Sequence, residues 1–131
     1  MTILKQKRHM ELSEIKRMII NLLLVLKECH SRHIIHRDIK PQNIIVDTNM
    51  RPKLIDFGLA ILTNECNESS IFKRCGTMGY MAPEVINSEK YNKPYSAKCD
   101  IFSLGIICHL LLLGSNPLKG KSYESTRALN Q

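Results

Sequence analysis

Apolar residues recur at intervals of three and four between Ser13 and His30, which is the period of an amphipathic helix. The repeating positions are Ile15, Met18, Ile19, Leu22, Leu23, Leu26 and Cys29. Ser13 stands where an N-cap is expected, and Glu14 adds a negative charge to the first turn, where the helix dipole favours it. The pattern therefore predicts a helix over residues 13–30 with one buried face.

Two short β-prone runs follow this helix, Ile44–Val46 and Lys53–Ile55. The residues between them, "DTNMRP", are typical of turns, so the two runs predict a β-hairpin. Ahead of the hairpin, Pro41 excludes a regular helix and favours an extended backbone at Lys40. We expect the residues between the first helix and the hairpin to form a loop.

The second half of the chain alternates between polar and strongly apolar stretches. Residues 62–75 are polar and lack periodicity, which predicts a long loop. The longest apolar run, Ile101–Leu113, follows Asp100 and precedes Gly114 and Pro117, as in a buried helix. Residues 118–131 show no strong pattern. The elements together predict one mostly α-helical domain over residues 1–131 with a small β-hairpin.

Composition places the chain among soluble globular proteins, with 44% hydrophobic and 24% charged residues in 131. The run Ile101–Leu113 is shorter than the roughly 20 residues that span a bilayer, and the N-terminus has no hydrophobic signal core. The five cysteines are odd in number and form no C-x-x-C pair, which favours free thiols in a reducing compartment. We therefore expect an intracellular protein, cytoplasmic or nuclear, that does not bind membranes.

The net charge of +7 indicates a basic surface that suits phosphates or acidic substrates. The basic residues are scattered, and the densest groups are Lys5/Lys7/Arg8/His9 and Lys73/Arg74. Aromatic residues make up only 5% of the chain and tryptophan is absent, so there is little to stack on bases. We expect no nucleic-acid partner.

Two short stretches carry the chemistry, "HRDIKPQN" at 36–43 and "DFG" at 56–58. In an extended loop, Asp38 and Lys40 point to the same side, which pairs a proton acceptor with a cation. Asn43 and Asp56 add hard oxygen donors of the kind that Mg²⁺ prefers. An acid, a cation and two metal donors together match phosphoryl transfer, in which the protein positions groups and neutralises charge.

Four motifs in order, "HRDIKPQN", "DFG", "GTMGYMAPE" at 76–84 and "DIFSLG" at 100–105, resemble the C-terminal lobe of eukaryotic serine/threonine protein kinases. The longer stretches "KRCGTMGYMAPEVI" and "CDIFSLGIICHLLLLG" look most similar to the calcium/calmodulin-dependent kinase group. The resemblance implies a partial kinase-like C-terminal lobe, ATP and Mg²⁺ as cofactors, and signalling through phosphorylation of serine and threonine in protein substrates. It implies nothing about oligomeric state.

The resemblance also assigns roles at the reaction centre. It makes Asp38 the catalytic base and places Lys40 against the transferred phosphate of ATP. The hydroxyl of Thr77 would meet both side chains, and Lys40 and Thr77 favour serine/threonine specificity. Asn43 and Asp56 would hold Mg²⁺.

Other residues take supporting roles by the same resemblance. His36 and Phe57 would pack to align the site, and Gly58 would be a flexible hinge at the start of the activation segment. Asp100 would accept hydrogen bonds from the backbone around His36, although alone it could be only an N-cap. Glu84 would be a buried carboxylate whose arginine partner is expected beyond residue 131, and an unpaired buried carboxylate costs about 3–5 kcal/mol.

Regulation is inferred from Arg37, which in the family often receives a phosphorylated residue of the activation loop. The usual phosphosite falls near Lys73, which cannot take that role, and Thr63, Ser69 and Ser70 are alternative acceptors. We expect activity to depend only weakly on phosphorylation of the loop.

Two departures bear on activity and substrate. The sequence has no Gly-x-Gly-x-x-Gly stretch and no V-A-I-K lysine, so the parts that clamp the nucleotide in the family are not found, and a fragment or truncated product is expected. Gln42 and Met78 also differ from residues frequent in the family, which leaves the substrate consensus open. The alternative is a non-catalytic kinase-like binding module.

A zinc site is a competing interpretation, because His30, His33 and His36 are evenly spaced next to Cys29. His36 belongs to the stronger "HRDIKPQN" motif, which disfavours zinc.

Overall fold

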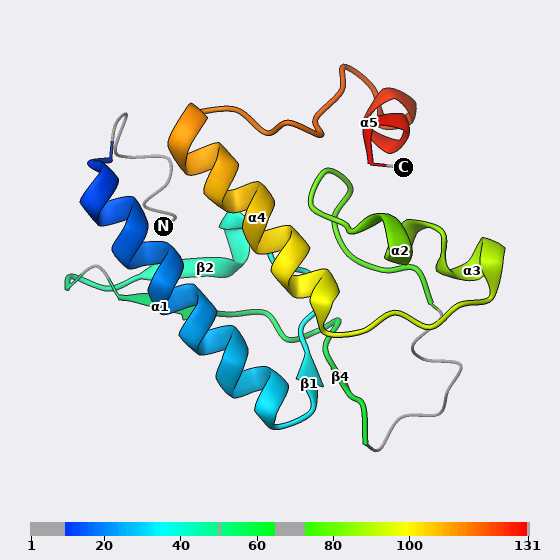
Figure 1. Ribbon diagram of the computed structural model, residues 1–131, viewed down its shortest axis with the longest axis horizontal. Helices are drawn as coiled ribbons and strands as arrows, with labels where there is room; N and C mark the ends of the chain where they lie inside the picture. Colours follow the sequence, from blue (N-terminus) through cyan, green and yellow to red (C-terminus); the bar gives the residue numbers. More distant parts are fainter. Residues whose placement is uncertain (1–9, 50, 65–72, 131) are drawn as a thin grey trace.

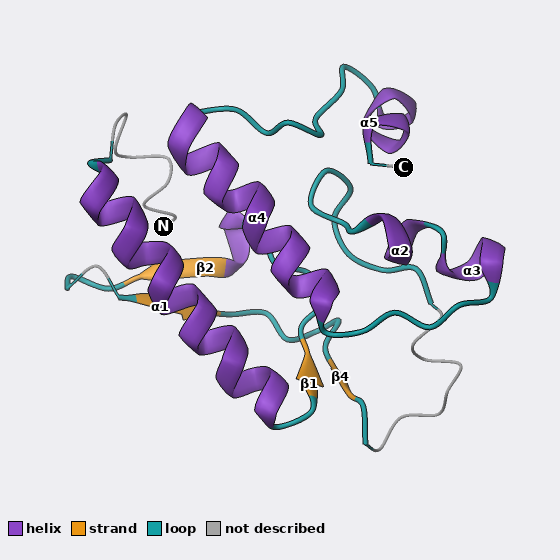
Figure 2. Cartoon of the chain, in the orientation of Figure 1, coloured by secondary structure: helices purple, strands orange, loops and turns teal. Residues whose placement is uncertain are grey.

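Two long helices and a β-hairpin form the centre of the molecule in the computed structural model, which describes residues 10–49, 51–64 and 73–130 (Figure 1). Helix α1 (Leu12–Ser31) contacts helix α4 (Lys98–Leu113) and the hairpin strand β3 (Pro52–Leu54). The predicted fold class, mostly α-helical with a small β-hairpin, is confirmed, and the structure adds a second two-stranded sheet (Figure 2).

Helix α1 begins one residue before the predicted start and has a different cap. Glu11 is the N-cap residue, and its backbone N–H donates to Glu14 Oε2 at 3.1 Å in a reciprocal capping box. The prediction of Ser13 as N-cap is therefore wrong, because the glutamate pair satisfies the first free N–H groups. The helix buries Ile15, Met18, Leu22 and Leu26, whereas Leu23, expected on the same face, is 42% exposed.

The predicted hairpin is confirmed. Strand β2 (Ile44–Val46) pairs antiparallel with β3, with Ile44 opposite Leu54 and Val46 opposite Pro52. In the turn, Asp47 Oδ1 accepts hydrogen bonds from the backbone N–H groups of Asn49 and Arg51. A short 3₁₀ helix, η2 (Pro41–Asn43), leads directly into β2 and so ties the motif at 36–43 to a fixed strand.

A second two-stranded ladder joins β1 (Ile34–Ile35) to β4 (Ile61–Leu62). The sequence did not predict it, since two residues are too few to show a periodicity. This ladder brackets the stretch that contains both the "HRDIKPQN" and the "DFG" motif, so each motif lies within a few residues of a paired strand.

Helix α4 starts at Lys98, with Ala97 as N-cap, and ends at Gly114, which adopts a left-handed φ of 72°. The predicted helix and its glycine stop are confirmed, and the start lies two residues earlier than Asp100. Its burial is only partial, because Ile101 is 44% exposed and Leu113 at the other end is 68% exposed. The main core lies where α4, α1 and the hairpin meet, and it consists of Met18, Leu22, Leu26, Ile39, Ile44, Val46, Leu104 and Ile107.

Three short helices complete the described chain: α2 (Pro83–Ile86), α3 (Ser88–Tyr91) and α5 (Tyr123–Leu129). A second apolar cluster packs α2 against the start of α4, and it consists of Ile35, Met81, Ala82, Val85, Ile86, Tyr95 and Cys99. Helix α5 lies beside the loop that precedes α2 (Figure 1). It falls in the region where no pattern was found, because one helical turn or two do not establish a period.

No helix within the described ranges is long and apolar enough to cross a membrane. Four cysteines in these ranges, Cys29, Cys75, Cys99 and Cys108, are free thiols, and Cys66 lies outside them.

Candidate active site

A carboxylate and an ammonium from the loop between β1 and η2 meet a hydroxyl from the loop before α2 in one closed ring of contacts. Thr77 Oγ1 donates to Asp38 Oδ1 at 2.7 Å, and Lys40 Nζ lies 2.7 Å from Asp38 Oδ2. Lys40 Nζ also donates to Thr77 Oγ1 at 2.8 Å. Residues 39 positions apart in sequence are thereby fixed against one buried carboxylate. We call this arrangement of Asp38, Lys40 and Thr77 the Asp38 ring.

Asn43 joins the Asp38 ring from the 3₁₀ turn. Its Nδ2 donates to the backbone O of Asp38 at 2.9 Å and to Asp38 Oδ2 at 3.1 Å. The turn holds it in place, since the Asn43 backbone N–H donates to the O of Lys40 at 3.0 Å. Because the amide nitrogen of Asn43 is directed at Asp38, its carbonyl oxygen, Oδ1, is available to ligate a cation.

The charge state of Asp38 follows from two opposed effects. Burial raises the pKa of its carboxyl, but hydrogen bonds from Lys40, Thr77 and Asn43 and the charge of Lys40 outweigh it, so that the pKa falls below its ordinary value. Asp38 is therefore an ionised acceptor at neutral pH, with its two oxygens held in fixed directions.

Asp56 follows Ile55, which pairs with Asn43 across the hairpin, but Asp56 lies outside the Asp38 ring. The Ile55 N–H donates to Asn43 O at 2.9 Å, which extends the hairpin ladder up to Asp56. Asp56 has a left-handed φ of 61° and an exposed side chain, and its Oδ1 accepts from the Gly58 N–H at 3.3 Å. In the described chain it makes no direct hydrogen bond to Asp38, Lys40 or Asn43. Gly58 itself shows no left-handed φ.

His36 connects the two motifs through its ring. It is fully buried, Nε2 donates to the O of Ile55 at 3.1 Å, and Nδ1 accepts from the Asp38 N–H at 3.3 Å. The Phe57 ring packs edge-on against it, with centroids 4.8 Å apart. One buried imidazole thus contacts the backbone at Asp38 and the residues on both sides of Asp56.

Asp100, at the start of α4, anchors the same loop through its side chain. Its carboxylate is 1% exposed and accepts from the backbone N–H groups of His36 and Arg37, each at 2.9 Å. His30 Nε2 lies 2.9 Å from Asp100 Oδ2. The residue is not an N-cap, because Ala97 holds that position, and its carboxylate stabilises the left-handed φ of 66° at Arg37.

The Arg37 guanidinium reaches across to the segment before α4. Its Nε donates to Leu59 O at 2.6 Å and its Nη1 to the Tyr95 hydroxyl at 3.0 Å. The Tyr95 hydroxyl in turn donates to Lys73 O at 2.8 Å. Burial, followed by the hydrogen bond to Cys75, raises the pKa of Tyr95, so its hydroxyl stays protonated. The sequence did not single out Tyr95, which stands in "PYSAKCD" without any periodic neighbour.

One sequence-based expectation needs correction, and the competing zinc interpretation finds no support. Glu84 is exposed at the start of α2, so the expected burial of an unpaired carboxylate, with its penalty, does not apply. The evenly spaced histidines do not gather either: His36 bonds Ile55 and Asp38, His30 bonds Asp100, and the described ranges contain no group of three metal-binding side chains.

The alternative phosphoacceptors are only partly described. Ser69 and Ser70 lie outside the described residues, while the Thr63 N–H donates to His33 O at 2.8 Å. Thr63 therefore sits at the end of the β1–β4 ladder rather than in a separate loop.

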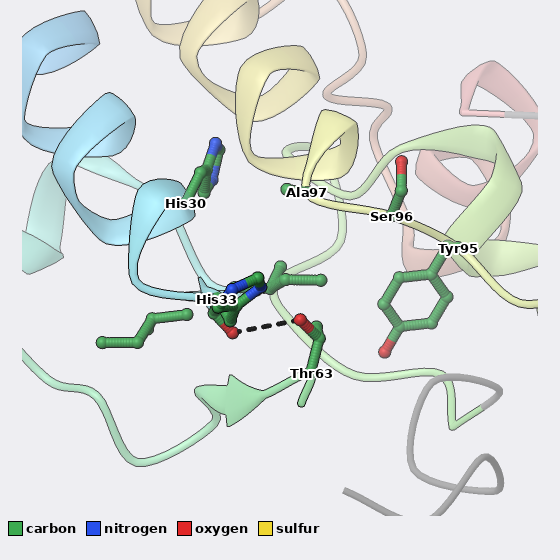
Figure 3. A pocket seen from close by; sticks show the side chains of 8 residues that line it. His30, His33, Thr63, Tyr95, Ser96 and Ala97 are labelled. Atoms are coloured by element: carbon green, nitrogen blue, oxygen red, sulfur yellow. Dashed lines mark hydrogen bonds between the residues drawn. The ribbon is translucent and has the colours of Figure 1, made fainter. Parts of the chain in front are cut away.

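A cavity of about 270 Å³ lies between the end of α1, the β1–β4 ladder and the segment before α4 (Figure 3). His30, His33, Thr63, Tyr95, Ser96 and Ala97 line it, and Thr63 Oγ1 donates to His33 O at 3.3 Å. None of the residues of the Asp38 ring takes part in its lining. This cavity is therefore separate from the Asp38 ring.

The donor set fits a magnesium-bound nucleotide. Asn43 Oδ1 and the exposed Asp56 carboxylate are hard oxygen donors on adjoining backbone segments, and Mg²⁺ uses few protein ligands together with substrate phosphates. Lys40 supplies a positive charge on the same loop as Asn43.

Comparison with known proteins identifies a family. The family model described as Protein kinase domain matches residues 1–131. Serine/threonine-protein kinase 33 of Bos taurus is 37% identical over 131 residues, which covers 93% of this chain and 26% of that protein. Serine/threonine-protein kinase SIK2 of Gallus gallus is 36% identical over 91% of the chain and 14% of its own length. An Aurora kinase of Eremothecium gossypii is 42% identical over 97 residues, which covers 74% of this chain and 25% of that protein. The chain spans about a quarter or less of these relatives.

Proposed function

This chain belongs to the protein kinase domain family, and we propose that it carries the catalytic loop of a serine/threonine protein kinase, which phosphorylates hydroxyl groups of proteins with ATP. The observation that carries the proposal is the Asp38 ring: an ionised carboxylate held by an ammonium and a hydroxyl, with Asn43 on the same carboxylate. The names of its relatives include serine/threonine-protein kinases, which supports the substrate class.

In the proposed reaction, Asp38 accepts a hydrogen bond from the substrate hydroxyl and orients its oxygen for attack. Lys40 neutralises negative charge that builds up on the transferred phosphoryl group. Asn43 and Asp56 would hold Mg²⁺, which when bound neutralises the phosphates of ATP. The backbone of this loop stays in position because Asp100 binds the N–H groups of residues 36 and 37.

The position of the chain within a kinase domain is part of the proposal. The helical content and the motif order support the C-terminal lobe, and the stretches 73–86 and 99–114 support the calcium/calmodulin-dependent group. The free thiols and the requirement for ATP support an intracellular location.

Weak dependence on loop phosphorylation is also proposed. The guanidinium of Arg37 already bonds Leu59 O and the Tyr95 hydroxyl, and Tyr95 bonds Lys73 O, so a neutral side chain links the loop that carries Asp38 to Lys73, near the usual phosphosite. Phosphatase treatment of the natural full-length protein is expected to leave most of its activity, while Tyr95→Phe lowers it. Abolished activity after phosphatase and in a Ser69→Ala/Ser70→Ala variant would refute this.

The test of the main proposal is phosphate transfer by the natural full-length protein that contains this chain. With ATP and Mg²⁺ we expect labelled phosphate on serine or threonine of a protein substrate, and tight nucleotide binding that weakens in Asp56→Asn. Asp47→Asn, in the hairpin turn, is the matched control and should change neither quantity, because asparagine retains the acceptor of the turn. Absent transfer and absent nucleotide binding, with tight capture of a protein partner, would instead support a non-catalytic binding module.

A further inference from the structure

A second cavity, of about 390 Å³, is lined by residues that are sequence neighbours of the Asp38 ring. One wall consists of Gln42 and the segment Met78–Tyr80, and the loop before α5 forms the other. Gln42 precedes Asn43, and Met78 follows Thr77, so this wall is continuous in sequence with two side chains that contact Asp38. A peptide whose hydroxyl reached Asp38 would have its neighbouring residues at this cavity.

Side-chain hydrogen bonds fix the cavity walls. Asn116 Nδ2 donates to Gly79 O at 3.0 Å, and Asn130 Nδ2 donates to Met81 O at 2.8 Å, which ties both ends of the α5 region to the opposite wall. Within the loop, the Gly120 N–H donates to Thr126 Oγ1 at 2.9 Å, so the loop that carries the neighbouring lysines is held against α5. A side chain at position 120 would overlap the backbone of α5, which leaves only glycine there.

Among the described residues, the charges on the lining are all positive. Lys119 and Lys121, on either side of Gly120, line the cavity with exposed side chains, and none of the described aspartates and glutamates takes part in the lining. Gln42 is neutral, and Glu124 lies on α5 outside the lining. The carboxylate of Asp38, in the neighbouring Asp38 ring, is paired with Lys40. A cavity with two ammonium groups and no carboxylate attracts anionic groups and repels arginine and lysine side chains.

We propose that this cavity binds an acidic side chain of the protein substrate, a carboxylate or a phosphorylated residue, next to the acceptor hydroxyl. The inference rests on the proposed kinase function and adds a substrate class to it. Lys119 and Lys121 determine the preference, and Gln42 adds a neutral wall.

The test measures peptide binding by fluorescence anisotropy with the natural full-length protein. Three peptides differ only in the residues beside the acceptor position, which carry aspartate, phosphoserine or arginine, and alanine replaces the acceptor so that no transfer occurs. We expect both acidic peptides to bind roughly tenfold more tightly than the arginine peptide, and less so at high salt. The double variant Lys119→Glu/Lys121→Glu should reverse the order, whereas Lys53→Glu, an exposed lysine on β3, should leave it unchanged.

Equal binding of the three peptides, tighter binding of the arginine peptide, no detectable binding of any of them, or an unchanged order in the double variant would overturn the proposal. The kinase function is read separately, as phosphate transfer to a mixed protein substrate. Transfer that persists without an acidic preference refutes only the substrate class. Absence of transfer from wild-type protein refutes the proposed function, whatever the peptides do.

Discussion

At the scale of the residue, the ionised state of Asp38 depends on its partners. Lys40, Thr77 and Asn43 lower the pKa of its carboxyl in the folded protein against the opposing effect of burial. A carboxyl with a lowered folded-state pKa stabilises the fold fully above its unfolded pKa, and this contribution is lost as pH falls through the folded value. Acid should therefore weaken the Asp38 ring only below the ordinary titration range of aspartate.

The lowered pKa of Asp38 leads to a prediction that compares wild type with Asp38→Asn. Both proteins are unfolded with urea at pH values from about 7 to about 2.5. The free energy of unfolding of wild type relative to the variant should be constant near neutrality and should decline only below pH 3.8, the reference value for aspartate. A difference that grows as the pH falls, or that changes near neutral pH, would contradict the assigned direction of the pKa shift.

Asp100 gives a second prediction at this scale. Asp100→Ala would leave the N–H groups of His36 and Arg37 without their acceptor in a buried position, and should lower the free energy of unfolding by roughly 3 kcal/mol or more. Asp100→Asn keeps one acceptor oxygen and should cost less. Equal and small losses for both variants, measured by urea denaturation, would show that the carboxylate does not hold the loop.

At the scale of the element, the ends of the helices reflect local chemistry. Helix α4 ends at Gly114 with a left-handed φ, which most residues adopt only with strain. Gly105 lies inside the same helix, and a Cβ added there would meet no atom of a neighbouring segment within 4 Å. A Cβ atom is therefore disfavoured by the backbone conformation at Gly114 and tolerated at Gly105.

Alanine substitution should therefore change the stability of the protein in opposite directions at the two positions. Gly114→Ala is expected to destabilise the protein by about 1 kcal/mol, because the left-handed conformation penalises a Cβ atom. Gly105→Ala is expected to stabilise it by about 0.5–1 kcal/mol, since alanine favours the helical backbone. Thermal unfolding of both variants measures this, and a shift of the same sign in the two would contradict the assignment.

The sequence predicted the elements with sustained periods or turn chemistry and missed the rest. Helix α1, the hairpin and α4 followed from apolar spacing, from "DTNMRP" and from Gly114. The β1–β4 ladder depends on pairing between distant residues, and α5 is too short to show a period. The one local signal of α5, the Ser122 N-cap, was not recognised, and Asn130 fixes the helix to Met81 O far away in sequence. The cap of α1 was misplaced because a glutamate pair replaced the expected serine.

At the scale of the whole molecule, the candidate site combines segments that are far apart in sequence. The motif at 36–43 receives Thr77 from the loop before α2 and Asp100 from α4, and α1 packs on α4 behind it. Sequence motifs identified Asp38, Lys40, Asn43 and Thr77 as one group. The contacts among these side chains were expected only because the motifs resemble those of protein kinases. The role of Tyr95 and the lysine-lined cavity depend on three-dimensional proximity alone and had no sequence signal.

The most direct measurement of the central claim is the rate of phosphate transfer by the full-length protein with Asp38 intact and with Asp38→Asn. Loss of the proton acceptor should lower kcat by roughly 10²- to 10⁴-fold while nucleotide binding stays the same, because asparagine retains the size of the side chain but not its charge. Transfer at the wild-type rate by a folded Asp38→Asn variant would show that the Asp38 ring does not carry the reaction.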